Sequence, residues 1–119
     1  MSLIRILFAF DGRISRTPFW LFTFATGVIV FVPVVFFLGF GSDAAEDYTD
    51  LCCLLLLWPS LAVQAKRWHD RDMSAWWILI NFVPFGIVFS LVQNGFMEGT
   101  PGANRFGANP LLASPANVA

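Results

Sequence analysis

Residues 17–42 read TPFWLFTFATGVIVFVPVVFFLGFGS, and they decide the fold because they contain no charged residue. Pro18 to Phe40 would make about 35 Å of α-helix, enough to cross a hydrocarbon core of about 30 Å with some tilt. Thr17 and Pro18 suit a helix start, because threonine accepts a bond from a free amide and proline is tolerated in the first turn. The stretch therefore predicts a membrane span over about 18–40.

A second apolar run, residues 51–65, follows an acidic segment. It makes only about 22 Å of helix, so a complete span must extend over about 50–68. The lysine and arginine at its end can reach the interface through their long stems. The acidic segment before it, residues 42–50, contains no basic residue and is expected to form a solvated loop.

The third apolar run predicts a span over about 74–97 and contains Pro84 and Gly86 near its middle. One arrangement is a single span kinked at Pro84. The other is a re-entrant hairpin, which returns the tail to the side from which the run started. We favour the single kinked span, because the uncharged run has the length of one crossing and broken backbone exposed to lipid is costly.

The predicted fold is therefore an all-α membrane protein with about three transmembrane helices in one domain, residues 1–110. A short helix over residues 2–10 is expected to lie in the membrane interface, since it is too short to cross. Residues 98–110 are rich in Gly, Pro and Asn, which predicts consecutive turns. Residues 111–119 are expected to be a disordered tail.

The composition also favours a membrane protein. Hydrophobic residues make up 57% of the chain and charged residues 13%, whereas a soluble domain is roughly 45–50% apolar and about 25% charged. The net charge of −1 argues against nucleic acid as a partner, because phosphate binding needs a dense basic patch. The adjacent Cys52 and Cys53 have neither disulfide nor metal-ligand spacing, and we expect no metal and no cofactor.

The basic residues predict the orientation. Positive side chains in short loops accumulate on the cytoplasmic side of a membrane. Basic residues precede the first span and separate the second from the third, whereas the acidic segment has none. The amino terminus is therefore expected in the cytoplasm. The two basic groups are Arg5, Arg13 and Arg16, and Lys66, Arg67 and Arg71.

Three motifs occur in a recognisable order. They are Phe10-Asp11-Gly12-Arg13-Ile14-Ser15-Arg16 before Phe19-Trp20, then Arg67-Trp68-His69-Asp70 before Ser74-Ala75-Trp76-Trp77, and then Gly99-Thr100-Pro101-Gly102 before Asn104-Arg105-Phe106-Gly107. Over roughly residues 5–110 the chain resembles the small bacterial inner-membrane family called domain of unknown function 805, with Trp68 where the family's run usually has Leu. The resemblance implies a multi-pass protein of the bacterial inner (plasma) membrane, and it implies no activity.

A cluster of charged and titratable residues is expected at the cytoplasmic interface, with Asp70 as its hub. On a helix, Arg67 lies three residues before Asp70 and Lys66 lies four before it, so each can meet the carboxylate. One hypothesis is structural: ion pairs within the cluster join the amino-terminal segment to the second loop. In a functional reading, the arginines bind a lipid headgroup phosphate, or Asp70 holds His69 for proton exchange. The members are Arg13, Arg16, Arg67, His69 and Asp70.

Two further polar groups are candidates. Gln64 and Asn81 are the clearest amides inside the spans, and we expect them to hydrogen-bond across helices in the inner leaflet. A polar path for a solute is the alternative. The tail residues Asn104, Arg105 and Gly107 form either a turn that docks a partner or a cap folded back on the helices.

These features predict an accessory or structural membrane component and not an enzyme, because a His–Asp pair without a nucleophile or metal cluster is a weak sign of catalysis. The alternative is a small transporter, channel or lipid-handling subunit. Three helices enclose little volume, so that role would need an oligomer or a larger partner. The expected partners are membrane lipids and either further copies of this chain or a larger membrane protein.

Overall fold

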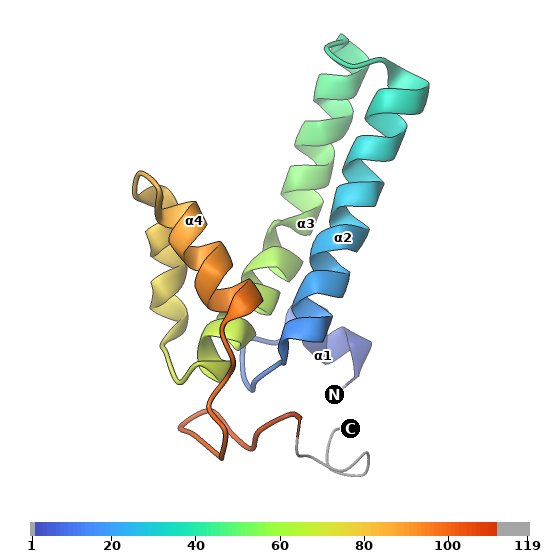
Figure 1. The fold of residues 1–119 in the computed structure, drawn as a ribbon. Helices are drawn as coiled ribbons and strands as arrows, with labels where there is room; N and C mark the ends of the chain where they lie inside the picture. Colours follow the sequence, from blue (N-terminus) through green and yellow to red (C-terminus); the bar gives the residue numbers. More distant parts are fainter. Residues whose placement is uncertain (1, 112–119) are drawn as a thin grey trace.

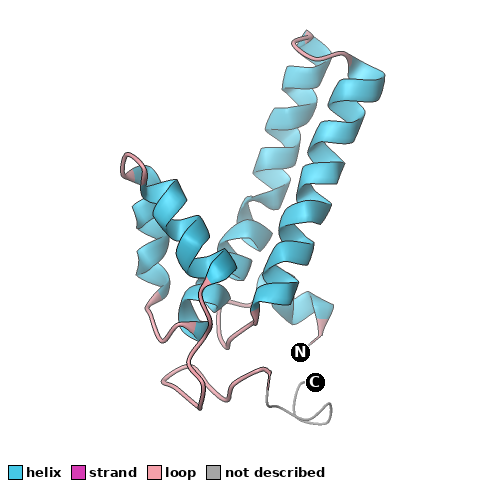
Figure 2. Ribbon diagram, viewed as in Figure 1, coloured by secondary structure: helices cyan, strands magenta, loops and turns pink. Residues whose placement is uncertain are grey.

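The structure is a computed structural model that describes residues 2–111 of the 119-residue chain. The named elements of this part are all helical, and they form one long and one short helical hairpin that meet at one end (Figures 1 and 2). The disordered tail was predicted for residues 111–119. Of these, only Leu111 belongs to the described residues, and 112–119 lie outside them. The elements are α1 (Leu3–Phe8), α2 (Arg16–Pro33), η1 (Val34–Leu38), α3 (Asp43–Asp70), η2 (Ala75–Phe82), α4 (Gly86–Leu91) and η3 (Val92–Phe96).

The long hairpin consists of α2, η1 and α3, and a tight turn joins its two legs. Gly39 and Gly41 have φ values of 86° and 82° in this turn, a conformation that glycine adopts without a Cβ penalty. Ser42 then caps α3, because its hydroxyl oxygen accepts a bond from the amide of Ala45 at 3.1 Å.

The acidic segment 42–50 is not the loop expected from the sequence, because Asp43–Asp50 are already helical. Ser42 at the N-cap satisfies a free amide, and the carboxylates of Asp43 and Glu46 lie in the first turn, where they favour the positive end of the helix dipole. The second helix is therefore about two turns longer than the predicted span over 50–68.

Both legs of the long hairpin are long and apolar enough to cross a membrane. The most apolar part of α2 and η1 has a mean hydropathy of 2.5, and only 6% of its residues are buried within the protein. Phe24, Phe31 and Leu54 are among the large apolar side chains that remain exposed. A helix that is apolar all round and not covered by protein matches a lipid environment.

Residues 75–96 form the short hairpin and not the single kinked span that we favoured from the sequence (Figure 1). Phe85 has a φ of 63°, and Gly86 contacts the other leg so closely that a Cβ there would overlap the carbonyl of Ile80. The backbone reverses at this point instead of bending. Each leg is only about 16 Å long, roughly half of a hydrocarbon core.

Trp68 holds the short hairpin against α3. Its ring is fully buried and stacks on Trp77 of η2 and Phe89 of α4, with centroid distances of 6.0 and 6.3 Å. One side chain thus contacts both legs, and the packing area of these large rings favours the folded hairpin.

The predicted short amino-terminal helix is present as α1, and it lies beside the carboxyl end of α3. Trp58 donates a bond from its indole nitrogen to the carbonyl of Phe8 at 2.9 Å, which joins the two helices. The tail after η3 returns to the same end and consists of turns and bends, as the sequence predicted for 98–110 (Figure 1). The molecule therefore has one end with the acidic turn and an opposite end at which α1, the start of α2, the end of α3 and the tail lie together (Figure 1).

Candidate functional site

Asp70 lies at the centre of the second end, between two arginines from different segments. Its Oδ1 accepts a bond from Arg13 Nε at 3.0 Å, and its Oδ2 forms an ion pair with Arg67 Nη1. Arg67 is fully buried, whereas Arg13 and Asp70 are each 4% exposed. A buried charge destabilises a fold unless it is paired and hydrogen-bonded, so these three side chains form one interdependent unit.

Backbone carbonyls take up the other donors of Arg13. They belong to Thr100 and Gly102, both at 2.8 Å, and to Gly107 at 3.2 Å. The Asp70 carbonyl in turn accepts a bond from the amide of Thr100 at 2.7 Å. The tail is therefore bound to the end of α3 through Arg13, a residue nearly ninety positions earlier in the chain.

Arg67 also donates to several backbone carbonyls of the protein itself. Its guanidinium donates to the carbonyls of Ile14 at 3.2 Å and Met97 at 2.9 Å, and to the carbonyl of Asn94. These carbonyls come from the segment before α2 and from the end of the short hairpin. Arg67 thus connects both hairpins, and its planar fork of donors suits several acceptors at once.

Lys66 does not meet Asp70, although their spacing allowed it. Its ammonium donates to the carbonyl of Arg5 at 2.8 Å and to the carbonyl of Ala9, which lie at the carboxyl end of α1. The Arg5 carbonyl also accepts a bond from the amide of Ala9 at 3.1 Å, and a cation here is favoured by the negative carboxyl end of the helix dipole. Lys66 therefore ties α1 to α3, and Arg67 faces Asp70.

His69 and Arg16 make contacts other than those considered from the sequence. The His69 ring donates from Nδ1 to the carbonyl of Gly12 at 3.0 Å and stacks on Phe106 at a centroid distance of 3.8 Å. Arg16 donates to the carbonyl of Phe96 at 3.1 Å. In this arrangement Asp70 does not hold His69, because both carboxylate oxygens face arginines.

The three tail candidates lie within a turn that folds back on α3. Asn104 and Gly107 exchange backbone hydrogen bonds, and the Asn104 side chain donates to the carbonyl of His69 at 2.9 Å. Arg105 pairs with Asp72 at 3.1 Å, in a contact that is partly exposed on both sides. Of the two arrangements considered for this segment, the contacts correspond to the cap.

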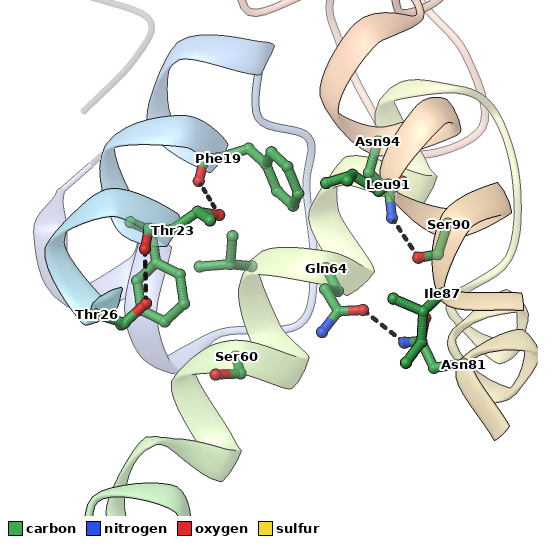
Figure 3. Close-up of a pocket in the computed structure, with 12 residues that line it drawn as sticks. Phe19, Thr23, Thr26, Ser60, Gln64, Asn81, Ile87, Ser90, Leu91 and Asn94 are labelled. Carbon is green, nitrogen blue, oxygen red and sulfur yellow. Dashed lines mark hydrogen bonds between the residues drawn. The ribbon is translucent and has the colours of Figure 1, made fainter. Parts of the chain in front are cut away.

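Gln64 and Asn81 are brought together as predicted, with Asn81 Nδ2 donating to Gln64 Oε1 at 2.8 Å (Figure 3). They lie in the wall of a cleft of about 410 Å³ between the long and short hairpins. Ser60, Thr23 and Thr26 also line it, and its lining, taken from the described residues, contains no charged side chain. Phe19, Phe22 and Ile87 supply part of its apolar wall.

Sequence reasoning missed three contributors to this end of the molecule. Asn94 is 1% exposed and donates to Ser90 at 3.2 Å, and both residues lie within an otherwise apolar run. Their spacing of four residues was the available signal. Gly99 has no such signal, because only the folded tail places it so close to Asp70 that a Cβ would overlap the carboxylate.

Within residues 2–111, His, Cys, Asp and Glu side chains do not gather in groups of three or more that could hold a metal ion. Cys52 is buried and Cys53 is exposed, and both are free thiols.

Comparison with known proteins gives a family and relatives over nearly the whole chain. The family described as "Protein of unknown function (DUF805)" matches residues 7–108. Inner membrane protein YhaH of Escherichia coli K12 is 35% identical, with 94% of this chain and 95% of the relative covered. Inner membrane protein YhaI of the same strain is 33% identical, with 96% of each covered. No solved structure matches the chain.

Proposed function

This chain belongs to the family described as "Protein of unknown function (DUF805)", and on that premise we propose that it is a multi-pass inner-membrane protein with an accessory or structural role and no enzymatic activity. The inner-membrane relatives and the two long apolar helices support the membrane location. The structural role is supported by one observation above all: the buried Arg13, Lys66 and Arg67 side chains donate to groups of the protein itself.

This observation supports the structural interpretation of the cluster over lipid headgroup binding. A phosphate needs donors that it can reach, and charge-assisted bonds to it form from accessible Arg or Lys side chains. Arg67 and Lys66 are fully buried, and Arg13 donates to one carboxylate and to several carbonyls. We therefore propose that Arg13, Lys66, Arg67 and Asp70, here named the charged end, hold the two hairpins, α1 and the tail in one arrangement.

For the topology, we propose that α2 with η1 crosses the membrane, that α3 crosses back, and that the short hairpin is re-entrant. The legs of the short hairpin are too short to span, and the tail is bonded to the same end as α1. Positive residues concentrate at this end, which supports a cytoplasmic amino terminus. The acidic turn before α3 would then face the periplasm.

Cysteine labelling tests this topology. We expect Ala44→Cys to react with a membrane-impermeant maleimide added to intact cells, and Ala108→Cys to react only after the membrane is opened. Both alanines are exposed, and the background carries Cys52→Ala and Cys53→Ala. Labelling of both positions from outside would place the tail in the periplasm. This result would support the single kinked span and contradict the re-entrant hairpin.

For His69, we expect substitution to affect stability and not an activity. His69→Ala removes a hydrogen bond and a ring stack, which together contribute about 1–3 kcal/mol to the free energy of unfolding. Membrane abundance should fall in His69→Ala and in Phe106→Leu alike, because each loses the same stack. The measurement is complementation of a deletion strain plotted against protein abundance. A His69→Gln variant with normal abundance and no complementation would argue for proton exchange.

A second candidate role, lipid handling, is favoured by a different observation: the uncharged cleft between the two hairpins. Its volume is within the range of small-molecule sites, and its lining mixes apolar rings with a few polar groups. Membrane lipids are the partners that such a cleft would meet first in a bilayer. Association with further copies of the chain or with a larger membrane protein stays part of the structural proposal.

A further inference from the structure

We propose that the cleft between the long and short hairpins binds an ester-linked acyl chain of a lipid, and that Gln64 recognises the ester carbonyl. This inference rests on the proposed embedding of the protein in the membrane. The site lies outside the charged end, and the donor that would recognise the ligand is the side-chain amide of Gln64.

The first step concerns the free donors of Gln64. Its Oε1 accepts the bond from Asn81, which orients the amide so that Nε2 points away from Asn81 and toward the space beside Ser60 and Thr26 (Figure 3). Among the described residues, Gln64 Nε2 has no acceptor within hydrogen-bond distance, and it is not among the fully buried side-chain atoms that lack a partner. It is therefore accessible and can donate to a molecule in the cleft.

The second step concerns what a ligand must offer. An amide N–H in a low-dielectric site needs an acceptor, because burying it unpaired is costly. The Thr23 and Thr26 hydroxyls donate to backbone carbonyls of their own helix, at 2.9 and 3.0 Å, so they add little donor capacity. The described residues that line the cleft include no charged side chain, which disfavours a phosphate or carboxylate at this point. An uncharged carbonyl oxygen fits these conditions.

The third step concerns depth in the membrane. Gln64 lies three residues before Arg67 and six before Asp70, so it is about 4.5 and 9 Å from them along the axis of α3. The headgroup layer on each side of a bilayer is about 5–8 Å thick, the difference between the total and hydrocarbon thickness divided between two faces. If the charged end lies among the headgroups, Gln64 reaches the level where ester carbonyls meet hydrocarbon.

The fourth step concerns access for the acyl chain. Ile87 and Leu91, on the short-hairpin side of the cleft, are 66% and 40% exposed, so this wall is not closed over by protein. Phe19, Phe22 and Val63 supply apolar surface on the opposite side. A chain entering from the bilayer would contact apolar walls while its ester oxygen meets the Gln64 amide.

The test compares two lipids that differ only in the carbonyl. The full chain is purified in nanodiscs that contain equal amounts of diester and diether phosphatidylglycerol with the same chains, and retained lipid is counted by native mass spectrometry. A single neutral hydrogen bond predicts a roughly 3–10-fold preference for the diester lipid. Gln64→Leu should abolish the preference. Gln93 accepts a bond from Arg71 at 3.0 Å and does not line the cleft, so Gln93→Leu, which also removes a bonded amide, should keep the preference. Equal retention of both lipids by the unmodified chain would overturn the proposal.

Two further arms separate recognition of the ester from recognition of the headgroup. Dioleoylglycerol carries the ester without a phosphate, so it should also be preferred over its diether analogue. Retention that depends on the phosphate would overturn the proposal by moving recognition to the headgroup. If Gln64→Leu does not fold, Ser60→Leu narrows the cleft without touching the Gln64–Asn81 bond and should also remove the preference. A chain that lacks any ester preference but keeps the expected cysteine-labelling pattern would refute the ester site and leave the membrane topology standing.

Discussion

Asp70→Asn is expected to lower the free energy of unfolding in detergent by about 3–5 kcal/mol, because it leaves two buried guanidinium groups without a counter-charge. Arg13 and Arg67 approach opposite oxygens of the same carboxylate, and neither can reach water without opening the fold. Asparagine keeps the shape of the side chain but presents an amide donor to one of the arginines. Loss of this unit should release the tail and the amino-terminal segment together.

The matched control is Asp72→Asn, which removes the same charge two residues later. Asp72 pairs with Arg105, and the two side chains are 43% and 64% exposed. Exposed ion pairs contribute roughly 0–1 kcal/mol to stability. The free energy of unfolding of this variant should therefore be close to that of the unmodified protein. Titration with sodium dodecyl sulfate, followed by circular dichroism and by protease cleavage of the tail, measures both variants. Equal effects of the two substitutions would contradict a structural role for the charged end.

Gly86→Ala is expected to destabilise the protein by about 1–3 kcal/mol, because the added Cβ overlaps the carbonyl of Ile80 in the other leg of the short hairpin. The obstacle is backbone and cannot rotate away as a side chain can. The amide of Gly86 also donates to the carbonyl of Val83 at 2.8 Å in the turn. Separation of the legs would remove Trp77 and Phe89 from Trp68.

Gly27→Ala provides the control for this substitution. Gly27 lies within α2, where an added Cβ meets no atom within 4 Å. Alanine in a helix interior is favoured over glycine by roughly 0.5–1 kcal/mol, so Gly27→Ala should be neutral or stabilising. The same detergent titration gives both values. If the Gly86→Ala variant is as stable as the Gly27→Ala variant, Gly86 does not lie this close to the carbonyl of Ile80, and the structure of the short hairpin is contradicted.

The helical elements were largely predictable from local signals. Residues 17–42 lack charge over a membrane-spanning length, and this property does not depend on any partner. The start of α3 also has a local signal, since Ser42 followed by acidic residues is a helix-start pattern, although the same acidic composition is typical of a solvated loop. Gln64 and Asn81 were paired correctly because unpaired amides in apolar surroundings seek one another.

The choice between a span and a hairpin for residues 75–96 was beyond sequence reasoning. Pro84 and Gly86 permit either a bend or a reversal, and local propensity does not distinguish them. The reversal is favoured by contacts with Trp68, which lies on another helix. Similarly, helical spacing allowed both Lys66 and Arg67 to meet Asp70, and the position of α1 assigned Lys66 to carbonyls instead.

The sequence by itself determined that this protein is helical and embedded in a membrane, because hydrophobicity, charge placement and helix length are properties of contiguous residues. Tertiary structure alone decided which charges pair, where the tail lies and how the cleft forms. Arg13, Asp70 and Thr100 are far apart in the chain, and their partnership depends on the geometry with which α3 gathers the other segments. Buried charges and amides take whichever partner the folded backbone brings within hydrogen-bond distance, so spacing along the chain does not identify that partner.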